Sequence, residues 1–115
     1  MLKFFDRLKG SNVAIFAEGL ATQLQKRYPP ELDNTPSKRP SVNRLTRIIE
    51  DACAKASEFG TQQQLGWLGK ARLGNHFRWK LTEAGYRKEF VDFATEAVIV
   101  HISRGRPGSP NKEGQ

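Results

Sequence analysis

Residues 61–103 read TQQQLGWLGKARLGNHFRWKLTEAGYRKEFVDFATEAVIVHIS, and this stretch decides the fold. It contains both tryptophans, both histidines and a dense mixture of aromatic and basic side chains. Its apolar residues recur at spacings of three and four, which places them on one face of a helix that turns about 100° per residue. We expect the first helix to begin at Thr61, because Thr61 and Gln64 have the spacing of a capping box. A second helix is expected after Gly85, which suits the left-handed position at a helix end.

The first of these helices has two different faces. Leu73, Phe77 and Leu81 share one face and predict a stripe that packs in the core. Trp79 falls on the other face, where a large apolar ring lies among charged side chains. The helical phase therefore predicts that Trp79 is exposed and available to a partner.

A competing pattern is present at two places in the stretch. Residues 76–82 also alternate, with Phe77, Trp79 and Leu81 on one side, and residues 98–102 are rich in β-branched side chains. Both features are typical of strands, so an α+β fold with two short strands is the alternative. Two strands alone are marginally stable in water, and helices are therefore the favoured prediction.

Earlier parts of the chain predict further helices. Residues 1–9 form a short amphipathic segment, and we expect Gly10 to end it. An apolar stripe follows and stops at Tyr28, because the next residues are prolines, which disfavour helical geometry in the residue before them. Another stripe over residues 45–59 predicts a helix that ends at Gly60.

Two segments have the composition of irregular structure. Residues 29–40 contain four prolines and almost no apolar side chains, which predicts a loop. Residues 104–115 are rich in glycine, proline and charge, which predicts a disordered tail. We therefore predict one all-α domain, a small bundle of four or five helices over residues 1–103.

Composition limits the class of protein. The chain of 115 residues has a formal net charge of +7, which favours nucleic acid, an anionic membrane or an acidic protein as partner, and equally fits a solubilising surface. Cys53 is the single cysteine, so an internal disulfide is excluded and a cytoplasmic location is expected. Uncharged apolar runs fall far short of the about 20 residues of a membrane span, so we expect no integral membrane association.

No motif predicts catalysis, a metal or a cofactor. His76 and His101 are the only histidines, and no pair of residues has the spacing of zinc ligands. The glycines near Lys70 do not follow the order of a phosphate-binding loop, and no Gly-x-Ser-x-Gly turn is present. We therefore predict that the protein is not an enzyme and holds neither a metal nor a cofactor.

Nucleic-acid binding is one of two interaction hypotheses. Residues 60–88 contain six cations and one acid, a net charge of +5, interleaved with aromatic rings. Cations can contact phosphates while an exposed ring stacks on a base. A turn at residues 59–61 followed by three glutamines would also suit a helix-turn-helix. Within residues 62–88, the candidate contacts are Lys70, Arg72, Arg78, Trp79, Lys80, Arg87 and Lys88.

Self-association is the preferred hypothesis. The apolar face of the last helix, with Phe90, Phe93, Val98 and Ile102, is wider than one buried stripe requires. This excess fits burial from two sides, one of them a second chain. We predict a small basic interaction or adaptor protein that forms a homodimer or binds another protein, with nucleic-acid binding as the alternative.

Overall fold

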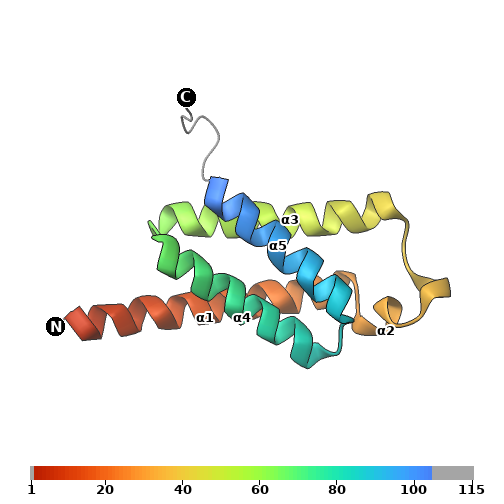
Figure 1. The fold of residues 1–115 in the computed structure, drawn as a ribbon, viewed down its shortest axis with the longest axis horizontal. Helices are drawn as coiled ribbons and strands as arrows, with labels where there is room; N and C mark the ends of the chain where they lie inside the picture. Colours follow the sequence, from red (N-terminus) through yellow and green to blue (C-terminus); the bar gives the residue numbers. More distant parts are fainter. Residues whose placement is uncertain (1, 105–115) are drawn as a thin grey trace.

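The computed structural model describes the backbone of residues 2–104 and the side chains of residues 12–104 (Figure 1). Its elements are α1 (Leu2–Arg27), α2 (Pro30–Asp33), the 3-10 helix η1 (Pro36–Lys38), α3 (Val42–Gln62), α4 (Trp67–Ala84) and α5 (Lys88–Arg104). The all-α prediction is confirmed. The alternative with strands at 76–82 and 98–102 is wrong, because both segments are helical and residues 2–104 contain no strand. Most of the predicted tail, residues 105–115, lies outside the described residues.

Four long helices form two layers around one core. In Figure 1, α4 crosses α1 and α5 crosses α3, and successive long helices run in alternating directions. The main contacts of α1 and of α5 are with α3 and α4, so each long helix has two principal neighbours. The Cα atoms span 50 × 36 × 18 Å, and the shortest dimension fits two layers of helices about 8–10 Å apart.

The core is built from the apolar stripes of these helices. The predicted stripe of Leu73, Phe77 and Leu81 is confirmed, since all three side chains are fully buried in α4. Phe16 of α1 stacks on Phe59 of α3 with ring centroids 4.1 Å apart. Burial of each leucine or phenylalanine of the α4 stripe contributes about 1.5–3 kcal/mol. The stripe therefore fixes which face of α4 points inward.

Two predicted helix ends at glycines are wrong. α1 continues through Gly10, because a glycine inside a helix costs only about 1 kcal/mol relative to alanine and cooperative neighbours outweigh it. α3 continues past Gly60 to Gln62, so the corner proposed at residues 59–61 is absent. Gly60 instead packs closely on α5, where a Cβ would lie 3.3 Å from a methyl group of Ile102.

Connections between the helices follow local turn chemistry. α4 begins at Trp67 rather than Thr61, after a turn in which Gln64 adopts a left-handed φ of 53°. Gly85 ends α4 with a φ of 103°, as its lack of a Cβ predicts. The segment predicted as a loop over residues 29–40 contains two short helices, α2 and η1, each with a proline at its start.

Candidate interaction surface

The outward face of α4 combines apolar and charged side chains. Leu68, Arg72, Asn75, Trp79 and Glu83 recur at intervals of three and four residues, so they share one face, and all five are exposed. We refer to these five residues as the α4 outer stripe. Trp79 is 61% exposed and Leu68 is 50% exposed, whereas the outward face of a surface helix is ordinarily polar.

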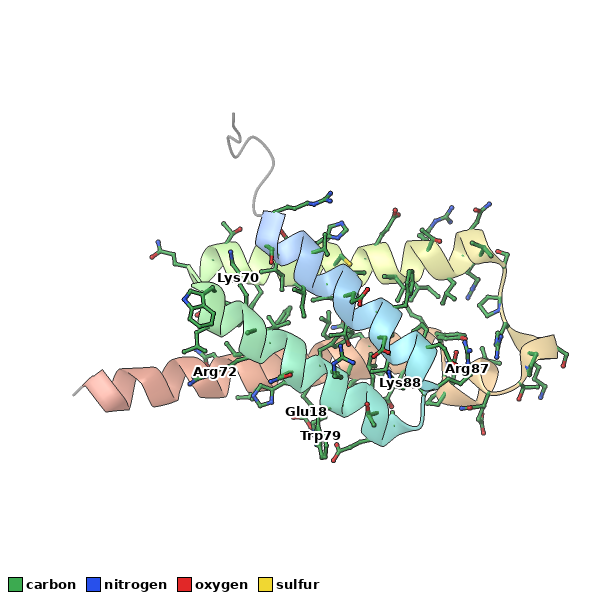
Figure 2. All side chains as sticks on the ribbon, viewed as in Figure 1. Glu18, Lys70, Arg72, Trp79, Arg87 and Lys88 are labelled. Carbon is green, nitrogen blue, oxygen red and sulfur yellow. The ribbon has the colours of Figure 1, made fainter. Side chains whose placement is uncertain are left out.

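The packing of α4 explains this exposure. The inward face is occupied by the buried stripe, so the core leaves no room for a second set of large side chains. Figure 2 shows Arg72 and Trp79 on the side of α4 that is turned away from α5, and Glu18 of α1 near them. Trp67, the first residue of α4, is 80% exposed. Trp79 therefore lies where its helical phase predicts, while the exposure of Trp67 adds a second ring.

A polar groove lies between α1 and α4, and one of its lining residues, Lys80, directly follows Trp79 in the sequence. Its volume is about 200 Å³, and its lining residues are Glu18, Ala21, Thr22, Gln25, Lys80, Glu83 and Ala84. The Nζ atom of Lys80 is 3.5 Å from Glu18 and 3.6 Å from Glu83. The groove is smaller than the about 300 Å³ at which pockets for small molecules begin, and its one cation, Lys80, already lies between its two acids.

Several predicted nucleic-acid contacts are engaged in ion pairs. Arg78 of α4 binds Asp92 of α5 at 2.5 Å and bridges the two helices, while Lys88 binds the same carboxylate at 2.7 Å from within α5. Hydrogen bonds from Lys88 and Arg78 hold the pKa of Asp92 below its usual value. Among the described side chains, Lys70 and Arg72 form no ion pair, and Figure 2 shows them on opposite sides of α4. The structure therefore divides the predicted basic surface instead of gathering it.

Arg87 belongs to a buried network that the sequence did not indicate. The carboxylate of Asp33, which is fully buried, accepts hydrogen bonds from the Tyr28 hydroxyl at 2.7 Å, the Arg87 backbone N–H at 2.8 Å and the Arg87 guanidinium at 2.9 Å. Burial alone would raise the pKa of Asp33, but these hydrogen bonds and the charge of Arg87 lower it below its usual value. The Tyr86 hydroxyl also donates to the backbone carbonyl of Tyr28. Arg87 therefore ties α2 to the start of α5.

Most of the residues predicted for self-association are buried in the core of the single chain. Phe90, Val98 and Ile102 are at most 3% exposed, so they offer no surface to a second copy. The apolar face of α5 is wide because α3 and α4 of the same chain cover it from two sides. Phe93 is 52% exposed and is the one member of the predicted set that faces outward.

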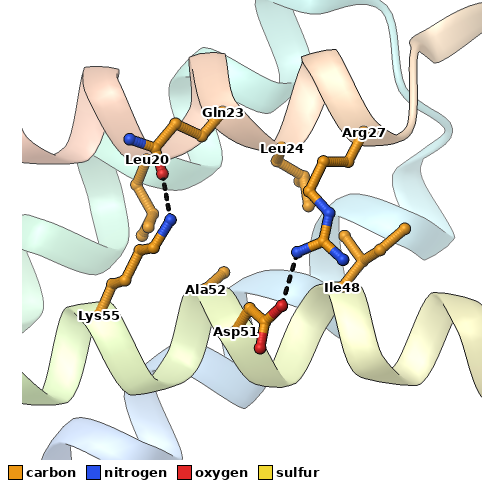
Figure 3. Close-up of a pocket in the computed structure, with 8 residues that line it drawn as sticks. All are labelled: Leu20, Gln23, Leu24, Arg27, Ile48, Asp51, Ala52 and Lys55. Atoms are coloured by element: carbon orange, nitrogen blue, oxygen red, sulfur yellow. Dashed lines mark hydrogen bonds and ion pairs between the residues drawn. The ribbon is translucent and has the colours of Figure 1, made fainter.

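The contact between α1 and α3 is closed by polar side chains (Figure 3). Arg27 pairs with Asp51 at 2.6 Å, and Lys55 donates a hydrogen bond to Gln23 at 2.5 Å. These pairs lie over a cavity of about 20 Å³, which has room for about one water molecule. A ligand larger than water does not fit between these helices.

Chemical groups with catalytic potential are scattered or buried. Cys53 is fully buried, and burial together with the nearby Glu50 raises its pKa to about 11, so the thiol is protonated at neutral pH. His101 is exposed and its Nδ1 lies 3.1 Å from the Ala97 carbonyl oxygen. Among the described residues, no three histidine, cysteine or acidic side chains gather as metal ligands.

Two further observations concern the whole chain. None of the helices in the described part has both the length and the apolar character that a membrane span requires. Comparisons with protein-family models, with curated proteins and with solved structures found no match. The surfaces described above are therefore the basis for a proposal of function.

Proposed function

We propose that this protein is a small interaction or adaptor protein that self-associates through the α4 outer stripe, and that it is not an enzyme. The exposure of Trp79 carries this proposal. A tryptophan that contributes little to the core of its own chain, on a helix whose other face is fully packed, is suited to anchor a partner. Tryptophan and arginine are enriched among the residues that dominate binding energies, and Arg72 lies two turns before Trp79.

The energetic argument rests on the exposed area. An aromatic side chain buries roughly 150–250 Å² when it is covered completely, at about 25 cal/mol for each Å² of apolar surface. Trp79 is 61% exposed in the single chain, so more than half of this gain is available to association, and the half-exposed Leu68 adds to it. The lone buried Cys53 fits action in the cytoplasm, where thiols stay reduced.

The test is the mass of the protein in solution over a concentration series. Light scattering in moderate salt should give about twice the 13.0 kDa mass of the chain. Trp79→Ala should shift the protein toward monomer, because it removes the anchor. Phe93→Ala is the matched control, since it also removes an exposed ring but from α5. A monomer at high micromolar concentration, or equal effects of the two substitutions, would contradict the proposal.

Nucleic-acid binding is the second candidate, and the surroundings of Trp67 favour it. Lys70 follows Trp67 by about one helical turn, so a phosphate contact and a stacked base are possible together. Affinity for oligonucleotides should then fall steeply with salt, and replacing Lys70 by alanine should flatten the slope by at most about 0.9. Replacing Arg78 and Lys88, which already pair with Asp92, is the control. Absence of binding at low salt would falsify this candidate.

A further inference from the structure

We propose that the second copy binds with its α4 antiparallel to the first, around a two-fold axis near Asn75. In this arrangement the guanidinium of Arg72 lies over the ring of the partner's Trp79. This inference rests on the proposed function, because it specifies how the same surface associates. Three properties of α4 support it, namely the spacing of the stripe, its charges and its helix dipole.

Four residues of the α4 outer stripe are placed symmetrically about its middle. Arg72 and Trp79 lie at equal distances from the point between residues 75 and 76, and so do Leu68 and Glu83. An antiparallel pair that crosses at this point therefore sets Arg72 against the partner's Trp79 in both halves. A two-fold interface requires this self-complementarity, because each contact must occur twice.

The charges of the stripe select the antiparallel direction. Arg72 lies in the N-terminal half of α4 and Glu83 lies in the last turn, so the face is positive at one end and negative at the other. Antiparallel helices bring Arg72 within reach of both the partner's Trp79 and the partner's Glu83, one turn further on. Parallel helices in register would place Arg72 against its own copy. The helix dipoles also favour opposed directions.

The exposed apolar face of α5 lacks this complementary arrangement of charges. Phe93 and Val100 are exposed on α5, and the exposed acids Glu89 and Glu96 flank Phe93. Because both acids occur along the same outward face, a second copy would bring acids against acids. Like charges that meet in an interface oppose association, so the α5 face is disfavoured for a symmetric contact.

Disulfide cross-linking of the full chain tests the register. Asn75→Cys places thiols of the two copies beside the axis, and mild oxidation should link most of the protein as covalent dimers. Glu83→Cys is the matched control on the same stripe. Its two copies are roughly 20 Å apart along antiparallel helices, given a rise of about 1.5 Å per residue, and a disulfide needs Cα atoms within about 7 Å. Cys53 is buried in the unmodified protein, so its thiol does not compete for cross-linking.

The outcomes separate this inference from the proposed function. Cross-linking of Asn75→Cys without cross-linking of Glu83→Cys supports the antiparallel arrangement. If light scattering shows a dimer but both variants cross-link, or neither does, the antiparallel arrangement is wrong while self-association stands. A protein that remains monomeric by light scattering overturns both. Circular dichroism of the two reduced variants verifies that each retains the helical content of the unmodified protein.

The cation–π contact has its own readout. Arg72→Gln keeps a long polar side chain but removes the charge that faces the partner's ring. Since a symmetric dimer contains this contact twice, the dissociation constant should rise roughly five- to thirtyfold. Arg72→Lys should recover part of the affinity. Equal dissociation constants for Arg72→Gln and the unmodified protein would contradict the contact between Arg72 and the partner's Trp79.

Discussion

Asp33 is the residue at which three separate parts of the chain meet. Tyr28 donates a hydrogen bond to it from just after α1, and Arg87 donates from the start of α5, 54 residues away. The Asp33 backbone carbonyl also accepts hydrogen bonds from the side chains of Arg39 and Arg87. A buried carboxylate is costly unless charged and polar donors surround it, and here its oxygens receive three. The network thus fixes the position of the proline-rich segment against the bundle.

Removal of Arg87 should destabilise the fold. Arg87→Ala leaves the fully buried carboxylate of Asp33 without its cation, which should lower the free energy of unfolding by roughly 2–4 kcal/mol. Arg78→Ala is the control, since its pair with Asp92 is partly exposed and should contribute at most about 1 kcal/mol. Urea denaturation measures both changes. Equal losses would mean that the Asp33 network is energetically no different from a surface pair.

The same network makes a prediction about alkaline pH. Burial, and then hydrogen bonding to Asp33, raises the pKa of Tyr28 to about 12, and burial raises the pKa of Tyr86 as well. A raised pKa means that the stability contributed by these phenols is complete below their unfolded pKa of about 10 and is lost as pH rises through the folded value.

Ultraviolet titration can follow both tyrosines, because the chain contains no others. In the folded protein, phenolate should be absent near pH 10 and should form together with unfolding at higher pH. In urea, both tyrosines should titrate near their ordinary pKa of about 10. A tyrosine that ionises at its ordinary pKa in the folded protein would contradict the buried arrangement.

At the scale of elements, the contact of α4 with α5 depends on Gly74. A Cβ at this position would lie 2.6 Å from the Cδ1 atom of Ile99, so the two helices pack around the missing side chain. A glycine inside a helix is unfavourable by about 1 kcal/mol relative to alanine, so a glycine at this position implies a close neighbour. Only the tertiary structure shows that this neighbour is Ile99.

Substituting glycines in two helices separates packing from helix propensity. Gly74→Ala should destabilise the protein by about 1–3 kcal/mol, since Ile99 must leave its position. Gly19→Ala in α1 should instead stabilise it by roughly 0.5–1 kcal/mol, because no atom lies within 4 Å of the added methyl group. Thermal melts measure both. A gain in stability for Gly74→Ala would show that α4 and α5 are not closely packed.

Periodicity in the sequence predicted the inward and outward faces of individual helices better than the contacts between helices. The inward stripe of α4, the outward position of Trp79 and the left-handed Gly85 follow from local geometry. The burial of Phe90 depends on which helices cover α5, and that is a property of the tertiary arrangement. Ion pairs could not be predicted from the sequence for the same reason. Arg78 of α4 pairs with Asp92 of α5, 14 residues away, so whether Arg78 is free to bind a partner depends on how the two helices pack.

At the scale of the whole molecule, the net charge of +7 is not concentrated on the cations that the sequence predicted as one nucleic-acid-binding face. Arg78 and Lys88 share Asp92, Lys80 lies between Glu18 and Glu83, and Arg87 is bound to Asp33. The two-layer arrangement instead leaves α4 at the surface with large apolar side chains on both of its faces. One face completes the core, and the other is the surface that we propose for association.

The measurement that tests this account most directly compares association with folding in Trp79→Ala. Sedimentation over a concentration series gives the dissociation constant, and a thermal melt with circular dichroism gives stability at a concentration where both proteins are monomeric. We predict that Trp79→Ala raises the dissociation constant by about 30-fold or more, which corresponds to the about 2 kcal/mol of a binding anchor, while monomer stability changes little. A loss of several kcal/mol in folding stability with unchanged association would contradict the account, because Trp79 would then belong to the core.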